Sequence, residues 1–239
     1  MKVKYNNLEM VIHVAIKLGN LLEKVVFLGG SATGLLITDP AAPDVRMTQD
    51  VDVIVEAATW IEYHRLEQEL LEKRFTHDTS EGAPVCRWLI DGVIVDVMPV
   101  SEEILGFSNL WYGPALQNSV TREVSPELSI RLVTAPYFLA TKIEAFRGRG
   151  NGDYLASHDL EDMITLIDGR KELLVEIITA PTDLRKFLAD TFRDYLATPA
   201  FVESISGHLL PDKASQGRLP LIVQRMTQIA ENLIEEQQS

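Results

Sequence analysis

The chain has 239 residues, of which 46% are hydrophobic and 24% charged, and its formal net charge at pH 7 is −13. This composition is typical of a soluble globular protein of one large or two modest domains. It contains no apolar run near the roughly 18 residues of a membrane-spanning helix, and no signal-peptide core. The acidic balance disfavours nonspecific nucleic-acid binding, and the single cysteine, Cys86, excludes an internal disulfide, so we expect a cytoplasmic protein without a membrane partner.

The first half of the chain combines strand-like and helix-like segments. Short apolar runs and valine-rich alternation predict strands, and apolar residues at helical spacing predict helices. Asp91-Gly92 joins two strand-like segments and is typical of a tight hairpin turn. The predicted elements are a helix from Leu8 to about Gly19, a strand at 25–28, a helix at 32–37, a proline-containing loop at 39–47, a strand at 50–55, a helix at 60–73 and strands at 85–90 and 93–98.

The second half of the chain has a mostly helical pattern. Thr134 followed by Pro136 is typical of a helix start, and Ser157 is a suitable cap for the next helix. The predicted helices are 134–147, 158–167, 171–179, 182–196 and 219–235. We therefore expect an α+β fold with a boundary near Ser125, which divides an α/β domain, 1–125, from a helical domain, 126–239.

Two carboxylates in the valine-rich strand are the most informative feature of the sequence. Asp50 and Asp52 point to one face of this strand, and the valines point to the other. Neighbouring acids repel each other unless one is protonated or a cation lies between them, and oxygen ligands of this kind suit Mg²⁺. A solvated edge strand is the alternative. Asp96 favours the metal site, because it interrupts an apolar hairpin strand where a buried acid is costly without a cation.

Gly29-Gly30-Ser31 joins the strand at 25–28 to the following helix. Glycines let the backbone approach a ligand, helix N-terminal amides attract anions, and Ser31 adds a hydroxyl donor. The turn is therefore a candidate phosphate site. The alternative is that glycine serves only the steric needs of a strand-to-helix turn.

Together these segments resemble a known family. Leu28-Gly29-Gly30-Ser31, Arg46-Met47-Thr48-Gln49-Asp50-Val51-Asp52-Val53 and Val95-Asp96-Val97 are similar to the nucleotidyltransferase core of the DNA polymerase beta superfamily. The likeness is closest to bacterial nucleotidyltransferases of the abortive-infection and toxin–antitoxin type. It continues in a lysine helix around Lys142 and a helix beginning at His158-Asp159, and covers roughly residues 25–167. It implies a mixed sheet with flanking helices, followed by a helical half that closes the nucleotide cleft.

The resemblance also implies roles for individual residues. Asp50, Asp52 and Asp96 would be the catalytic acids and bind Mg²⁺, with Mn²⁺ as the alternative ion, and Asp96 would help to deprotonate the attacking hydroxyl. Gly29, Gly30 and Ser31 would hold the phosphates of an NTP. Lys142 would meet the triphosphate, and Asp159 would order Lys142 or an arginine near the nucleotide. One departure is the long stretch between Ser31 and Asp50, whose surplus fits in the loop at 39–45. Another is His158, where related toxins often have arginine.

Other interpretations of the helical residues remain open. Spacing alone also fits a solvent-exposed Lys142 on an amphipathic helix. His158 and Asp162, four residues apart, have the spacing of a metal pair such as a zinc site, and Asp159 suits the start of a helix. For His158 we favour capping or packing.

Three other residues have weaker functional interpretations. Trp88 and Trp111 are suited to stacking on a base, but core packing is the expected role. Cys86 is also expected in the core.

Three functions compete. The first is a metal-dependent nucleotidyltransferase that moves an NMP from an NTP to a hydroxyl of tRNA or of a protein, which predicts a basic surface near Arg122, Arg147 and Arg149. The second applies the same chemistry to a small molecule such as an aminoglycoside, which the negative charge favours. The third is an inactive nucleotide-binding module, disfavoured because all three acids are present. A toxin role and an antitoxin partner are implied by the resemblance only.

Overall fold

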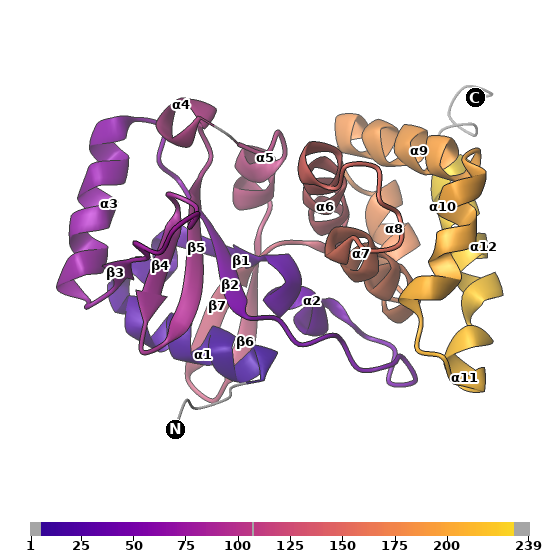
Figure 1. Cartoon of the computed structure of the whole chain (residues 1–239), viewed down its shortest axis with the longest axis horizontal. Helices are drawn as coiled ribbons and strands as arrows, with labels where there is room; N and C mark the ends of the chain where they lie inside the picture. The colour runs from indigo at the N-terminus through magenta and orange to yellow at the C-terminus, as the bar shows by residue number, and fades with distance from the viewer. Residues whose placement is uncertain (1–5, 107, 232–239) are drawn as a thin grey trace. The chain divides into compact units, whose positions relative to one another are not determined.

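The structure, a computed structural model, describes residues 6–106 and 108–231, which form two compact units (Figure 1). Unit 1 comprises Met1–Leu35 and Arg46–Thr134, and unit 2 comprises Leu36–Val45 and Ala135–Ser239. The division therefore falls after Thr134 rather than near Ser125. The difference has a simple reason: the last strand of the sheet lies beyond Ser125 and belongs with unit 1.

Unit 1 is built on a mixed sheet, in which the described residues form strands in the order β3-β4-β5-β2-β1-β7-β6. Pairs β1–β7 and β2–β5 are parallel, and the other neighbouring pairs are antiparallel. This sheet, with a helical second half, confirms the predicted α+β class. The strands are β1 (Val25–Leu28), β2 (Asp50–Val55), β3 (Thr76–His77), β4 (Arg87–Ile90), β5 (Val93–Pro99), β6 (Val120–Ser125) and β7 (Leu128–Leu132).

The central strands are anchored by their apolar side chains. All four residues of β1 are buried. In β2, Val51 and Val53 are fully buried while the alternating Asp50 and Asp52 remain partly exposed. This alternation confirms that the valines anchor the strand and leave the acids on the opposite face.

The β4–β5 hairpin has a clear sequence signal, and the β6–β7 hairpin does not. Asp91 and Gly92 join β4 to β5 with φ of 49° and 84°, and positive φ at both central residues is what a type I′ turn requires, so the predicted hairpin is confirmed. The β6–β7 hairpin was not predicted. Most of β6 is exposed and polar, so this edge strand lacks the apolar alternation by which strands are recognised.

The helices of unit 1 begin with local signals. Asn6 and Glu9 form a capping box at the first helix, and Thr59 and Glu62 form another at the third. The Tyr63 hydroxyl donates a 3.1 Å hydrogen bond to a β5 carbonyl and so holds the third helix against the sheet. The helices are α1 (Asn7–Leu18), α2 (Gly29–Leu36), α3 (Trp60–Glu72), α4 (Glu102–Leu105) and α5 (Tyr112–Gln117), with a 3-10 turn η1 (Gly19–Lys24).

The described residues of unit 2 form helices joined by loops and contain no strand. Its core includes a group of aromatic rings, in which Tyr195 stacks on Phe201 at 4.6 Å between ring centroids and Phe146 and Tyr154 pack nearby. The predicted 182–196 helix is confirmed, and the 219–235 prediction extends past the described residues. The helices are α6 (Ala135–Arg149), α7 (His158–Gly169), α8 (Leu173–Ile178), α9 (Thr182–Leu196), α10 (Pro199–Ser204), α11 (Lys213–Gln216) and α12 (Leu219–Glu231), with a 3-10 turn η2 (Ile205–His208).

The long loop between α2 and β2 is fastened within unit 2. The backbone N–H groups of Thr38 and Asp39 both donate to the carbonyl of Gly169, at 2.9 and 2.8 Å. Arg218 joins Asp39 to Asp168 through ion pairs of 3.0 and 2.7 Å. The loop that accommodates the extra sequence between Ser31 and Asp50 is thus an ordered part of the helical unit.

None of the helices in the described ranges is long and apolar enough to cross a lipid bilayer.

Candidate metal and nucleotide site

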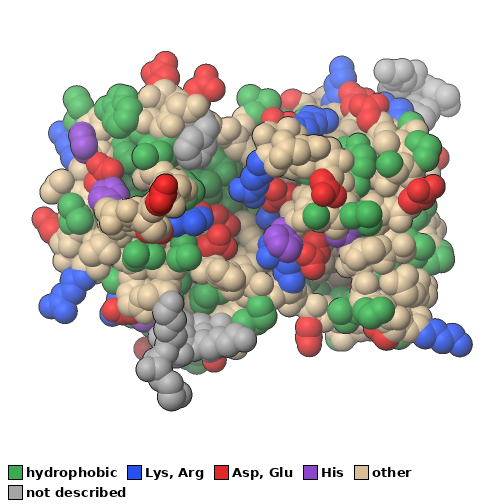
Figure 2. Space-filling view, viewed as in Figure 1, with side chains coloured by type: hydrophobic (Ala, Val, Ile, Leu, Met, Phe, Trp, Pro, Cys, Tyr) green, Lys and Arg blue, Asp and Glu red, His purple; other side chains and the backbone are tan. Residues whose placement is uncertain are grey.

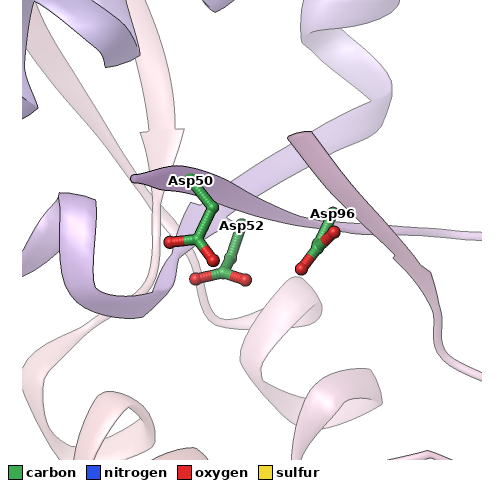
Figure 3. Close-up of side chains that lie close together, drawn as sticks. All are labelled: Asp50, Asp52 and Asp96. Atoms are coloured by element: carbon green, nitrogen blue, oxygen red, sulfur yellow. The ribbon is translucent and has the colours of Figure 1, made fainter. Parts of the chain in front are cut away.

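Three carboxylates meet on one face of the unit 1 sheet (Figure 3). Asp50 and Asp52 come from β2, and Asp96 comes from the adjacent parallel strand β5, directly opposite Asp52. One oxygen from each carboxylate lies within 4.8 Å of the others. The structure therefore brings together the three acids that the sequence singled out. The alternative of a solvated edge strand is wrong, because β2 lies between β1 and β5.

The N-terminal turn of α2 lies against this acidic cluster. Gly29 has φ of 74°, and a Cβ placed on it would lie 1.8 Å from Asp52 Oδ2. Only a residue without a side chain fits there, because the Asp52 carboxylate occupies the space that a Cβ would take. The helix begins at Gly29 rather than near Ala32, so the Gly-Gly-Ser segment is the helix's first turn instead of a linker before it.

Ser31 is a second feature of this helix start that suits a ligand. It is 2% exposed, and within the described ranges its Oγ atom has no hydrogen-bond partner. A buried hydroxyl without a partner costs free energy, and such groups often belong to a site for a ligand. Gly30, which lies between Gly29 and Ser31 in the sequence, is also buried. The donor set of three carboxylates suits a hard divalent ion, so the residues present fit Mg²⁺ or Mn²⁺.

Arg87 is a member of the cluster that the sequence analysis missed. Its Nε and Nη2 atoms donate to the two oxygens of Asp96, both at 2.8 Å, and Nη2 lies 3.9 Å from Asp50 Oδ2. The hydrogen bonds to Asp96 raise the pKa of the guanidinium further above its ordinary value. The signal was present in the sequence: a two-residue turn at Asp91-Gly92 places residue 87 opposite residue 96.

A second charged cluster lies in unit 2. Lys142 Nζ donates to Asp159 Oδ1 at 3.1 Å and to Asp162 Oδ2 at 2.6 Å, and all three side chains are less than 10% exposed. Arg149 donates two further hydrogen bonds to Asp159, at 2.9 and 2.8 Å. Burial opposes ionisation of Asp159, but its bonds to Arg149 and the charge of Lys142 outweigh burial and hold its pKa below the ordinary value.

These contacts decide between the earlier interpretations. Lys142 is not a solvent-exposed lysine, and Asp159 does contact both Lys142 and Arg149. The zinc pair is wrong, since Asp162 is paired with Lys142, whereas His158 is 74% exposed and contacts Glu161 at 3.0 Å. Whether Lys142 and Asp159 meet a nucleotide stays a prediction.

The remaining candidates are structural. Trp88 and Trp111 are 0% and 5% exposed, which confirms core packing over stacking on a base. Burial raises the pKa of the Cys86 thiol to about 12, so this thiol is not a reactive nucleophile at neutral pH. Figure 2 shows acidic and basic side chains intermixed over the face in view. Two of the expected basic residues are already paired, Arg147 with Glu144 and Arg149 with Asp159.

The fold and site together describe an α+β protein with a three-carboxylate cluster beside a glycine-containing helix start. No protein-family model matches the sequence, and no curated protein is a detectable relative. Among solved structures, the chain is similar to "an antigenic nucleotidyltransferase-like protein from Paracoccidioides brasiliensis", with 21% identity and a TM-score of 0.49 over 84% of this chain and 93% of that one.

Proposed function

We propose that this protein is a divalent-metal-dependent nucleotidyltransferase that moves an NMP from an NTP to a hydroxyl acceptor. One observation carries the proposal: Asp50, Asp52 and Asp96 present oxygens within 4.8 Å of one another, and Asp52 lies against Gly29 at the start of α2. Metal ligands and an anion-binding helix start at one place are what a metal–triphosphate complex needs.

The chemistry follows from these groups. The acceptor hydroxyl gives up its proton with the help of Asp96, its oxygen forms a bond to the α-phosphorus, the bond to the pyrophosphate oxygen breaks, and pyrophosphate leaves. Divalent ions, when bound, neutralise the charge on the attacking and leaving oxygens. Asp50, Asp52 and Asp96 hold those ions. Gly29, Gly30 and Ser31 orient the phosphates through the helix start and the buried hydroxyl, so catalysis consists mainly of positioning and charge neutralisation.

The residues of unit 2 have a supporting role in this proposal. Lys142, held by Asp159 and Asp162, contributes positive charge to the triphosphate, and Asp159 orders both Lys142 and Arg149. The acceptor is tRNA, a protein or an aminoglycoside. A toxin paired with an antitoxin is the biological setting that the sequence resemblance favours.

The direct test is transfer of label from each NTP labelled at the α-phosphate, with Mg²⁺ or Mn²⁺, to total RNA, total protein or an aminoglycoside panel. The Asp52→Ala variant removes one ligand and should abolish transfer while it leaves the fold intact. The matched control is Glu56→Ala, which removes an exposed carboxylate just beyond the same strand. This control should keep wild-type activity.

The acceptor class that takes up label identifies the substrate. Transfer that persists unchanged in Asp52→Ala contradicts the proposed metal site. Binding of an NTP without transfer to any of these acceptors favours a missing acceptor or activator, and the absence of both binding and transfer contradicts the proposal.

A further inference from the structure

Arg87 introduces a permanent positive charge into the acidic cluster. On the sheet, Asp52, Asp96 and Arg87 occupy directly opposed positions of three neighbouring strands, β2, β5 and β4. Directly opposed residues point to the same face of a sheet, so the guanidinium shares that face with the carboxylates. The side chains of Arg87 and Asp96 are only 24% and 12% exposed, so this pair is shielded from water far more than an ordinary surface pair.

Arg87 and Asp96 form a bidentate guanidinium–carboxylate contact. Both oxygens of Asp96 accept hydrogen bonds from Arg87, which fixes the plane of the carboxylate as well as its position. Nη2 also lies 3.9 Å from Asp50 Oδ2. The same nitrogen is therefore close to two of the three acids that would ligate a metal ion.

This arrangement changes the charge that a metal ion meets. Three carboxylates and one guanidinium leave the cluster with a formal charge of −2, where the acids alone would have −3. One divalent ion balances −2. A second ion would leave an excess of positive charge near a shielded site, unless a triphosphate brought negative charge with it.

We propose that Arg87 is a built-in counter-ion of the metal site, which competes with free divalent cations and makes entry of a second ion depend on the nucleotide. This inference rests on the proposed function and assigns Arg87 a role within it. Arg87 is a positioning residue: it acts on Asp96 and on the charge of the cluster, without itself binding the metal.

The test measures direct binding of Mn²⁺ to the full-length protein without nucleotide. The electron paramagnetic resonance signal of free Mn²⁺ reports how much of the ion is bound. Arg87→Met removes the charge and keeps much of the side-chain length, and should bind Mn²⁺ about tenfold more tightly or take up an additional ion. Arg87→Gln is a second neutral variant, in case the methionine variant does not fold. Arg87→Lys keeps the charge and should stay within about threefold of wild type.

The outcomes separate this inference from the proposed function. Unchanged or weaker Mn²⁺ binding in folded Arg87→Met or Arg87→Gln overturns the counter-ion role, because a purely structural arginine would only disturb Asp96 when lost. Arg87→Lys binding as tightly as the neutral variants would also overturn it. The proposed metal site is tested independently by Asp52→Ala, which should lose Mn²⁺ binding whatever residue stands at position 87.

Discussion

Replacement of Gly29 by alanine tests the link between the start of α2 and the acidic cluster. The added Cβ would lie 1.8 Å from Asp52 Oδ2, whereas ordinary contacts begin at 3.4 Å, so the carboxylate has to move by about 1.6 Å. A metal site tolerates ligand displacements of only about 0.2 Å. The φ of 74° adds strain of about 1–2 kcal/mol for a residue with a side chain. The added Cβ would also lie 2.8 Å from Asp52 Cβ, so the β2 backbone has to shift as well. We expect a loss of stability larger than the backbone strain alone and a loss of metal affinity of tenfold or more.

Gly92→Ala is the matched control for this variant. Gly92 also has a positive φ, 84°, but a Cβ built on it meets nothing within 4 Å. Gly29→Ala should therefore lose more free energy of unfolding than Gly92→Ala in urea titrations, because both variants share the positive-φ strain but only Gly29→Ala also meets Asp52. Only Gly29→Ala should lose Mn²⁺ affinity, measured by calorimetry. Wild-type Mn²⁺ affinity in a folded Gly29→Ala protein would refute the reasoning that Asp52 is a ligand held in place by this contact.

Three further predictions concern other parts of the molecule. Ser31→Ala should leave the free energy of unfolding unchanged or raise it, by up to about 1 kcal/mol, because it removes a hydroxyl buried without a partner, yet it should weaken NTP binding several-fold in calorimetry. Lys142→Met should lower the free energy of unfolding by about 3 kcal/mol in urea titrations, because two buried carboxylates lose a cation, and a loss below 1 kcal/mol would contradict the observed pairing. The N–H of Ala41, followed by Arg218, holds the pKa of Asp39 at about 2, below its ordinary 3.8. Its stabilising contribution is therefore present above pH 3.8 and is lost as the pH falls toward 2, so the difference in urea midpoint between wild type and Asp39→Asn should vanish over that range.

Local patterns were sufficient for much of unit 1. The alternation of Asp50 and Asp52 with valines determined which face of β2 is acidic, because successive side chains of any strand point to opposite faces. The turn at Asp91-Gly92 determined the β4–β5 register, and with it the pairing of Arg87 with Asp96. The spacing of residues 87 and 96 about this turn is therefore enough to predict that pairing.

Other features have no local signal. β6 is a polar edge strand, and α4, α5 and β3 are too short to show a periodic pattern. The sequence of the loop at Leu36–Val45 predicts only a connection between α2 and β2. The loop nevertheless belongs to the helical unit, because Gly169 and Arg218 of that unit bind it. Contacts of this kind depend on which distant segments pack together, and turn composition carries no information about that.

The sequence by itself determined the chemistry available to this protein: three acids in strands, a glycine-rich helix start and a lysine in an apolar helix. Only the tertiary structure decided that these groups act together within each unit. Asp96 meets Asp52 because β5 pairs in parallel with β2, and Lys142 is buried by Asp159 and Asp162 because α6 packs on α7. The physical reason is that strand and helix periods are set by neighbouring residues, whereas strand pairing and helix packing are set by the burial of apolar surface across the whole chain.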